Sequence, residues 1–219
     1  MQEATQQKNL YPLQLIEDDV ALAQSIVMLL SAAGYTCVHY KSAEEFLGVM
    51  MSTPQAHGIP SCVISDIRLP KLSGMDLLEI VKRDHPQCVW PIILITGHAD
   101  VEMAVKAMHQ GAFDFLSKPF DPFLLTQKID KALEKSNALM QQNSFLKDYE
   151  QHFATLTEQE KKVCSLILEN LTNREIAELL GNSTRTIEIH RASVFKKMHV
   201  DSIVDLAKNS ERYNLLMSQ

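Results

Sequence analysis

Apolar residues in the first 120 positions form short runs that are separated by longer amphipathic segments. Five of these runs predict β-strands, at Leu13–Ile16, Tyr35–Tyr40, Ser61–Asp66, Trp90–Thr96 and Ala112–Leu116. The segments between them have helical spacing and predict helices at Asp19–Ala33, just after Ser42, at Ser73–Arg83, at Asp100–Gln110 and from Pro122 onward. Strands that alternate with helices predict an α/β fold, a doubly wound sheet of five parallel strands.

Local signals mark several of the helix ends. Gly34 and Gly111 each follow a predicted helix, and glycine is the preferred residue just beyond a helix C-terminus. Ser42 is followed three residues later by Glu45, which is the spacing of a capping box at the start of a helix. The boundaries of these helices are therefore supported by more than the apolar pattern.

A helical pattern runs without a break from about Asp121 to Glu150. Every seventh position along one edge is apolar, at Leu125, Ala132, Leu139, Leu146 and Phe153. The interleaved positions, Ile129, Ser136, Asn143 and Glu150, are mostly polar. The pattern is compatible with a weak coiled-coil seam and equally with a solvated connector helix, and the sequence leaves both open.

Four helices are predicted from Thr157 to the end of the chain. Thr157 and Glu160 have capping-box spacing, and the helix that they begin runs to Asn170. The other helices are predicted at Arg174–Leu180, from Ser183 to about Met198, and from Asp201. Gly181 ends the second helix, and Asn182 is a candidate to close the turn because asparagine tolerates the left-handed conformation. This order is typical of a helix-turn-helix.

The pattern divides the chain into an α/β domain at 10–135, a helical linker at 136–154 and a small all-α domain at 155–219. No apolar stretch approaches the roughly 20 residues of a membrane span, and the polar start lacks an apolar signal region, so we expect no membrane partner. The four cysteines have no CxxC spacing, which indicates a reducing, cytoplasmic location and speaks against a zinc site.

The net charge of −6 is unevenly distributed along the chain. Residues 1–149 contain 17 acidic residues and 12 Lys or Arg, whereas residues 150–219 contain 10 and 9. A basic signal over the whole chain, as in many nucleic-acid-binding proteins, is therefore absent. Any contact with DNA has to come from a local basic patch.

Polar residues follow four of the predicted strands, at the point where each strand ends. They are the pair Glu17-Asp18, then Asp66, Thr96 and Lys118. In open parallel sheets ligands bind outside the carboxyl ends of the strands, so we expect these side chains to share one site. Acids, a hydroxyl and an amine are the groups needed to hold a divalent metal and to accept a phosphoryl group.

Roles within this site follow from the chemistry of each group. Mg²⁺ prefers oxygen ligands, which Asp18, Asp66 and the backbone carbonyl of Arg68 can supply, with Glu17 acting through water. Asp66 is the expected phosphoacceptor. Lys118 would add positive charge, and the hydroxyl of Thr96 would donate to a phosphate oxygen, because phosphoryl transfer needs mainly positioning and charge neutralisation.

This set of residues resembles the receiver domain of two-component response regulators, and the stretch Pro91–Phe120 is similar to its FixJ/NarL-type group. The resemblance implies a sensor histidine kinase as partner and a cis peptide bond at Lys118–Pro119. It places Phe115 at the position of the aromatic residue that follows Thr96 during switching. It also implies a face used for homodimerisation on phosphorylation, which comprises Val101, Val105, Lys106, Phe115 and Lys128.

Two departures from the usual receiver pattern concern the phosphate. Glu17 stands where aspartate is commoner, and its longer side chain affects direct contact with the metal. Arg68 and His98 lie two residues after Asp66 and Thr96, at positions that tune phosphate lifetime in the family. We expect this bulky pair to shield the phosphoryl group, and the alternative is that both residues are solvated at the rim.

The C-terminal stretch resembles the LuxR/NarL/FixJ helix-turn-helix domain through Leu156–Glu160, Asn173–Ala177 and Thr186–His190. The apolar stripe of its third helix, Ile187, Val194 and Met198, is expected to be buried. Charged residues on the other faces form a local basic patch. The expected DNA contacts are Asn173, Arg185, Thr186, Glu188, Arg191, Lys196 and Lys197.

Within that patch the chemistry separates two kinds of contact. Arg191 can bridge guanine and Glu188 can accept from cytosine, so we expect both near bases. Arg185, Lys196 and Lys197 are expected at phosphates, which position the protein without specifying sequence. The alternative is that this charged face is merely solvated.

The sequence therefore predicts a transcriptional response regulator, phosphorylated on Asp66 with Mg²⁺, that dimerises and binds double-stranded promoter DNA, with RNA polymerase as a further partner to consider. One alternative is a constitutive DNA-binding dimer whose receiver no longer responds to phosphate. Another is an output through protein contacts only. A phosphatase of the haloacid dehalogenase type is disfavoured, because Arg68 stands where a second aspartate is needed. We expect no enzymatic turnover of a separate substrate.

Overall fold

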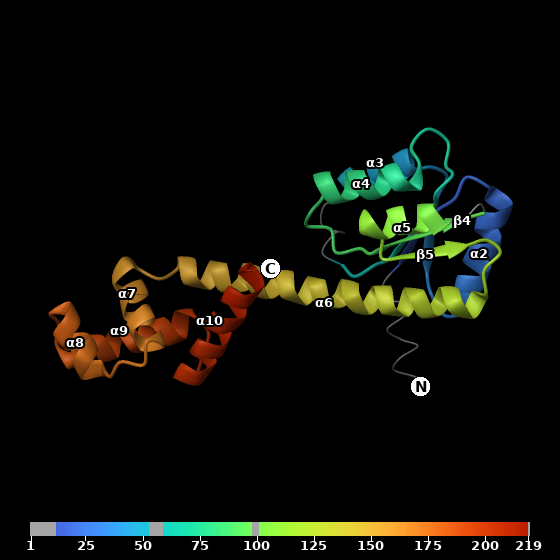
Figure 1. The fold of residues 1–219 in the computed structure, drawn as a ribbon. Coiled ribbons are helices and arrows are strands. Elements are labelled where there is room, and N and C mark those ends of the chain that lie inside the picture. Colours follow the sequence, from blue (N-terminus) through green and yellow to red (C-terminus); the bar gives the residue numbers. More distant parts are fainter. Residues whose placement is uncertain (1–11, 53–58, 98–100, 219) are drawn as a thin grey trace. The chain divides into compact units, whose positions relative to one another are not determined.

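The computed structural model describes residues 12–52, 59–97 and 101–218. The chain forms two compact units, which divide between Met140 and Gln141, and each unit is described by itself. One helix, α6 (Pro122–Ala154), runs through this division without a break (Figure 1). The predicted boundary at 135 falls within α6, whereas the predicted boundary at 154 coincides with the last residue of this helix.

The first unit contains the predicted parallel sheet. Its strands are β1 (Leu13–Ile16), β2 (Cys37–Tyr40), β3 (Val63–Asp66), β4 (Ile92–Thr96) and β5 (Asp114–Ser117). They are ordered β2-β1-β3-β4-β5, and every neighbouring pair is parallel. The α/β prediction is confirmed. Tyr35, predicted to begin the second strand, lies just before it. Its side chain is buried, and its hydroxyl donates a 2.5 Å hydrogen bond to Asp130 Oδ1.

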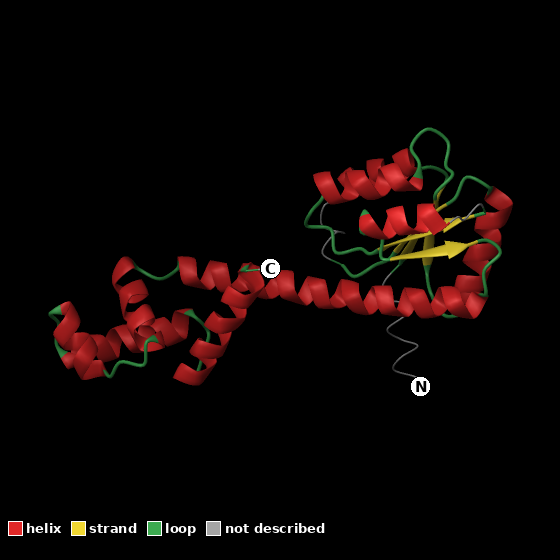
Figure 2. Cartoon of the chain, viewed as in Figure 1, coloured by secondary structure: helices red, strands yellow, loops and turns green. Residues whose placement is uncertain are grey.

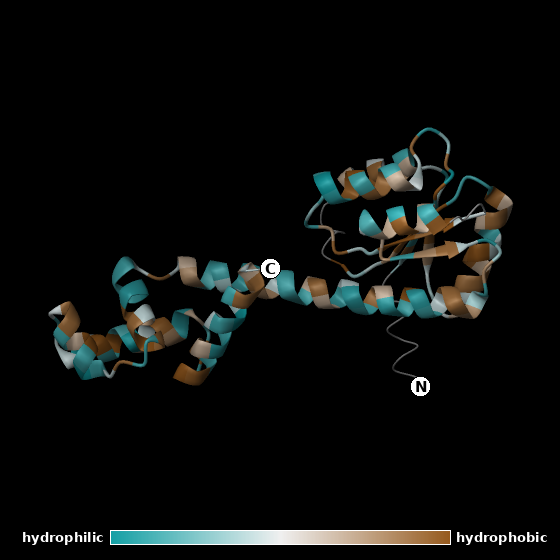
Figure 3. Ribbon diagram, viewed as in Figure 1, coloured by the Kyte–Doolittle hydropathy of each residue, from teal (hydrophilic) through white to brown (hydrophobic). Residues whose placement is uncertain are grey.

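Helices cover both faces of this sheet. They are α2 (Val20–Ala32), α3 (Ala43–Ser52), α4 (Gly74–Asp84), α5 (Val101–His109) and the first half of α6. One core packs α2 and α6 residues such as Ile26 and Ile129 against the sheet, and the other packs α3 and α4 residues such as Phe46 and Leu77. The strands are mainly hydrophobic between these layers (Figures 2 and 3), as expected for a sheet buried on both faces.

The capping signals are borne out with one difference. Gly34 and Gly111 have positive φ angles of 86° and 84° at the predicted helix ends. Ser42 accepts from the backbone N–H of Glu45 at 3.2 Å, as predicted. The Glu45 carboxylate, however, accepts from the N–H of Lys41 at 2.7 Å and not from that of Ser42. The reciprocal half of the capping box is therefore displaced by one residue.

The first half of α6 is the fifth helix of the α/β unit and not a free coiled-coil seam. Leu125, Ile129 and Ala132 have no exposed surface and belong to the sheet's core. Ser136 is equally buried, and its hydroxyl is satisfied there because it accepts a 3.1 Å hydrogen bond from the N–H of Ser61. The predicted fifth helix from Pro122 onward is therefore confirmed, whereas neither a coiled-coil seam nor a solvated connector describes this half of α6.

The second unit contains α7 (Glu158–Leu168), α8 (Asn173–Leu180), α9 (Thr184–Lys197) and α10 (Ile203–Met217), together with the end of α6. Apolar residues from α7, α8, α9 and α10 form its core. The predicted capping box at Thr157 and Glu160 is present. A second capping box starts α8 at Thr172, one residue earlier than expected.

The turn between α8 and α9 differs slightly from the prediction. Gly181 takes the left-handed conformation with φ 65°. Asn182, the predicted candidate, is not among the described residues with positive φ. It stabilises the turn by hydrogen bonds instead, because its backbone N–H donates to Ala177 at 2.9 Å and its side chain to the carbonyl of Leu180 at 3.2 Å.

Among the helices of the described residues, none has the length and apolar character needed to span a membrane.

Candidate phosphoacceptor site and nucleic-acid interface

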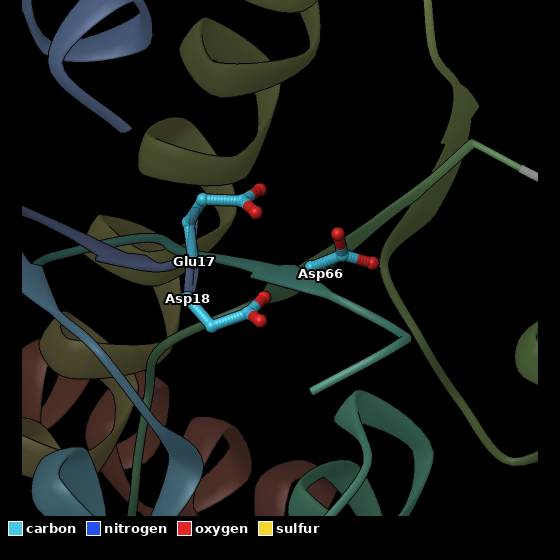
Figure 4. Close-up of side chains that lie close together, drawn as sticks. All are labelled: Glu17, Asp18 and Asp66. Carbon is cyan, nitrogen blue, oxygen red and sulfur yellow. The ribbon is translucent and has the colours of Figure 1, made fainter. Parts of the chain in front are cut away.

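The sheet brings the predicted acids and the lysine to one edge. Glu17 directly follows β1, Asp66 ends β3, Thr96 ends β4, and Lys118 directly follows β5. Since β1, β3, β4 and β5 are parallel neighbours, their carboxyl ends meet at the same edge of the sheet. Figure 4 shows the carboxylates of Glu17, Asp18 and Asp66 at this edge.

The three acids form a compact cluster. One carboxylate oxygen from each of Glu17, Asp18 and Asp66 lies within 4.8 Å of the others. Glu17 and Asp66 are buried, whereas Asp18 is exposed. Burial raises the pKa of Glu17, the neighbouring Asp66 raises it further, and Lys118 opposes both effects. Negative charge is thus concentrated where one acid reaches solvent.

Lys118 joins two of these acids. Its Nζ donates to Glu17 Oε2 at 2.6 Å and to Asp66 Oδ2 at 2.5 Å. Burial lowers the pKa of Lys118, but the hydrogen bonds to Asp66 and Glu17 outweigh burial and leave the pKa above its ordinary value. Lys118 is therefore charged at neutral pH. Its backbone N–H donates to the carbonyl of Thr96 at 2.7 Å, and the Lys118–Pro119 peptide is cis, as predicted.

The loop after Asp66 depends on a residue that the sequence did not single out, Gly74. A Cβ atom at Gly74 would lie 2.4 Å from the backbone oxygen of Asp66, so only glycine allows α4 to begin this close to the acid. The N–H of Gly74 donates to Ile67 at 3.0 Å, and the N–H of Arg68 donates to Asp66 Oδ1 at 2.8 Å. These contacts fix the carboxylate. A glycine one residue after the cap Ser73 was the available signal.

The cluster fits a magnesium ion by donor type and spacing. Opposite ligands of an octahedral Mg²⁺ site, with bonds of about 2.1 Å, are about 4.2 Å apart. Three ligands cannot all be opposite one another, and adjacent ligands are about 3.0 Å apart. The carboxylate oxygens of Glu17, Asp18 and Asp66, which lie within 4.8 Å of one another, would therefore close in by up to about 1.8 Å around the ion.

The other predicted receiver residues are placed as follows. Thr96 is completely buried, and Phe115 is half-buried against the core that contains α3 and α4. Arg68 is exposed beside Asp66, and His98 lies outside the described residues. On the predicted dimer face, Val101 and Val105 have 82% and 49% of their surface exposed, and Lys106 is also exposed. Lys128 is engaged within the chain by an ion pair with Asp114.

Helix α9 presents the predicted DNA-contact residues. Ser183 caps it by accepting from the N–H of Thr186 at 3.1 Å, and Ile187, Val194 and Met198 are buried as predicted. Three of the predicted contacts, Arg185, Glu188 and Lys196, are exposed. The geometry thus leaves three charged side chains of α9 open to a ligand.

Two further predicted contacts, Arg191 and Asn173, bind each other across the helix-turn-helix. Arg191 Nη1 donates to Asn173 Oδ1 at 3.2 Å, and the guanidinium lies 5.3 Å from the ring centroid of Phe195. Both residues are half-buried. The contact joins the start of α8 to the middle of α9 and orients the guanidinium before any ligand binds.

Lys197 is a correction to the predicted DNA contacts. Its Nζ donates to Glu160 Oε2 at 2.6 Å, and Glu160 is buried at 5% exposure. Ser193 also donates to Glu160 at 2.6 Å. The hydrogen bonds from Lys197, Ser193 and Thr157 lower the pKa of Glu160 to about 2. Lys197 therefore neutralises an internal carboxylate, and sequence reasoning missed this because Glu160 was already explained as a capping residue.

Comparisons with known proteins agree with this geometry. The family of response regulator receiver domains matches residues 13–130, and the luxR family of bacterial regulatory proteins matches residues 154–209. Transcriptional regulatory protein FixJ of Bradyrhizobium diazoefficiens is 35% identical over 202 residues, 92% of this chain and 95% of FixJ. Tetrathionate response regulatory protein TtrR of Salmonella typhimurium is 34% identical over 200 residues, 90% of this chain and 91% of TtrR.

Solved structures give the same result. The response regulator StyR matches 93% of this chain and 99% of its own, with a TM-score of 0.82 and 30% identity. Full-length FixJ from B. japonicum matches 93% of this chain and 97% of its own, with a TM-score of 0.55 and 33% identity. With both family matches found on one chain, beside an acidic cluster and a helix-turn-helix, the protein belongs to the two-component response regulators that join a receiver domain to a luxR-type DNA-binding domain.

Proposed function

We propose that Asp66 accepts a phosphoryl group from a sensor histidine kinase and that this modification promotes dimerisation and promoter binding. The observation that carries the proposal is the position of the Asp66 carboxylate, which lies beside the acids Glu17 and Asp18 and contacts the ammonium group of Lys118. An Asp66 oxygen would form the new bond to phosphorus while the bond from phosphorus to the kinase imidazole breaks. Lys118 is already in place to offset charge on the transferred group.

Glu17, Asp18 and Asp66 are the proposed metal ligands, with the backbone carbonyl of Arg68 as a fourth. Bound Mg²⁺ would supply the positive charge that lets a phosphoryl group approach an acidic cluster. Asp18 is exposed and therefore accessible to an ion from solvent, whereas the buried Glu17 is held by Lys118. Arg68 and His98 are proposed to tune the lifetime of the phosphoryl group.

Thr96 and Phe115 are the proposed route from Asp66 to the dimer face. Thr96 ends the strand next to Asp66, and Phe115 lies one strand further on, paired in register with Leu94. A ligand shifts such an equilibrium only through contacts that differ between two states, and the Thr96 hydroxyl would contact phosphate in one state alone. Val101, Val105 and Lys106 offer an exposed surface for a second copy.

DNA binding is proposed to use the exposed side of α9. Arg185 and Lys196 would contact phosphates, and Glu188 and Arg191 would approach bases. Asn173 and Thr186 complete the proposed set. Lys197 is withdrawn from it because of its ion pair with Glu160. Because promoter DNA and the kinase's phosphohistidine are found in the cytoplasm, the protein is proposed to act there.

Sedimentation and promoter-fragment binding test this function, for the wild type and Asp66→Asn, each with and without beryllofluoride. We expect beryllofluoride to increase dimerisation and DNA affinity in the wild type alone. Incubation with acetyl phosphate should add the mass of a phosphoryl group to the wild type and not to the variant. Equal DNA affinity under all conditions would favour the constitutive dimer, and an increase in both proteins would uncouple Asp66 from output.

A further inference from the structure

A pocket of about 380 Å³ lies in the first unit, away from the acidic cluster. It opens at the start of β4, at Ile92, whereas the site described above includes Thr96 at the other end of this strand. Its walls come from α4, the loop that enters β4, the residues before β5, and α6. Every residue that lines the pocket belongs to the described part of the chain.

The floor of the pocket is apolar. Leu78, Val81, Val89 and Ile92 line it, and each is at most 5% exposed because the side chain belongs to the sheet's core or packs beside it. The aromatic rings of Trp90 and Phe113 extend the apolar lining. A pocket of this volume lies within the range of about 300–1,000 Å³ that is usual for small-molecule sites.

The rim of the pocket is cationic. Lys82 of α4 and Lys135 of α6 both line it, together with His85, and no carboxylate does. Within the described residues neither lysine forms an ion pair. Two ammonium groups of unmatched charge therefore border one apolar hollow, in a stretch of chain where acids outnumber bases 17 to 12 over residues 1–149.

Both lysines are positioned by their neighbours. A Cβ atom at Gly111 would lie 1.6 Å from Lys82 Nζ and 2.9 Å from its Cε, so the absence of a side chain at Gly111 makes room for the ammonium group. Lys135 Nζ lies 5.5 Å from the centroid of the Phe113 ring, a cation–π distance. Both lysines are exposed residues whose ammonium groups lie at the solvent-facing edge of the pocket.

We infer that this pocket binds a small amphipathic monoanion, in which an apolar chain or ring carries one carboxylate. The carboxylate would lie between Lys82 and Lys135, and the apolar part would cover Val81, Val89 and Trp90. An inorganic anion would leave the apolar floor in water, and a neutral ligand would gain no attraction from the two ammonium groups. The bound molecule would contact α4 and α6 together, near the point where α6 leaves the first unit.

Trp90 provides a direct assay, because it is the only tryptophan of the chain and lines the pocket. The full-length protein is titrated with octanoate, and Trp90 fluorescence is recorded, with 1-octanol and octylamine as matched neutral and cationic probes. We expect a saturable change with octanoate and a weaker or non-saturable one with the two controls. Inorganic phosphate should not displace octanoate at equal concentration.

Lysine variants test whether octanoate binds in this pocket. The double variant Lys82→Gln/Lys135→Gln should raise the dissociation constant for octanoate about five- to tenfold, whereas Lys131→Gln, on exposed α6 surface outside the pocket, should not. Circular dichroism checks that each variant keeps its fold. Trp90 also lines a neighbouring apolar hollow beside Val38 and Val49, and binding there would not respond to the lysines. An equal affinity in the double variant, an equal response to octanol, or displacement by phosphate would each overturn the inference.

Discussion

Replacing Lys197 by glutamine should destabilise the second unit, because Lys197 is the cation that faces a buried carboxylate. Glu160 has 5% of its surface exposed and accepts from Lys197 and Ser193, each at 2.6 Å, and from the N–H of Thr157 at 2.7 Å. Without Lys197 the remaining donors carry no formal charge. The carboxylate would then be buried without a compensating positive charge.

Two order-of-magnitude arguments bound the size of the effect. Removing one partner of a buried ion pair costs about 3–5 kcal/mol, and the 32% exposure of the Lys197 side chain moves the expected value below that range. The shift of the Glu160 pKa from 4.5 to about 2 corresponds to about 3 kcal/mol for all its donors together. Lys197 is the largest of these donors, so we expect the variant to lose about 2 kcal/mol of unfolding free energy.

Urea denaturation followed by two probes measures this loss. Trp90 lies in the first unit and should report an unchanged transition, whereas the helical circular dichroism signal should gain a component that unfolds at lower urea concentration. Lys196→Gln is the matched control, because Lys196 is exposed. It should change stability by less than about 0.5 kcal/mol and should reduce the salt dependence of DNA binding by about one phosphate contact.

The acid dependence of stability gives a further check. A depressed folded-state pKa stabilises the protein above the unfolded value of 4.5, and this contribution is lost as the pH falls from there towards about 2. The wild type should therefore lose stability in this window more steeply than Lys197→Gln. If Lys197→Gln altered only the salt dependence of DNA binding and left the urea transitions unchanged, Lys197 would be a phosphate contact and the structural argument would be wrong.

Three other predictions concern both units. Gly74→Ala should cost about 1–3 kcal/mol in urea unfolding followed by Trp90, because its Cβ would meet the Asp66 backbone oxygen at 2.4 Å; Gly48→Ala, where a Cβ meets nothing within 4 Å, should be neutral or stabilising. Glu17→Gln should lower the pH at which calorimetric Mg²⁺ binding is half-lost, because the pKa of Glu17 is raised by burial. Tyr213→Ala should destabilise the second unit by roughly 1 kcal/mol or more in the same urea assay, since its ring stacks on α6 at 4.5 Å; an unchanged transition would refute this packing.

Local chemistry made most of the fold and the acidic cluster predictable. A carboxylate at the end of a predicted strand, such as Asp66, can be placed from the sequence alone, because parallel strands bring their carboxyl ends to the same edge of the sheet. The importance of Gly74 could not be predicted in this way. Its importance comes from an approach to the Asp66 backbone that appears only once α4 is placed. The ion pair of Lys197 was not predicted for a related reason. Its partner Glu160 lies 37 positions away and was already explained as a capping residue.

The periodicity of α6 shows the same limit and also bears on how two copies could meet. Leu125 and Ala132 repeat with Phe153 at heptad spacing, but the first two are buried under the sheet. Phe153 stacks beside Tyr149, which in turn stacks on Tyr213 of α10. Residues at equal heptad spacing therefore have different environments, because Leu125 and Ala132 are buried in the first unit whereas Phe153 is 37% exposed.

Of the predicted seam only Leu139 and Leu146 remain outside these contacts, and a coiled coil needs about three to four heptads. Two apolar positions cannot hold two helices together against the loss of freedom on association. We therefore expect a dimer of this regulator to use another surface. In the first unit the proposed surface is the α5 face, where Val101 is 82% and Val105 49% exposed. Exchanging Val101 for a charged residue should consequently abolish beryllofluoride-induced dimerisation in sedimentation, while exchanging Leu139 should leave it intact; the reverse result would restore the coiled coil.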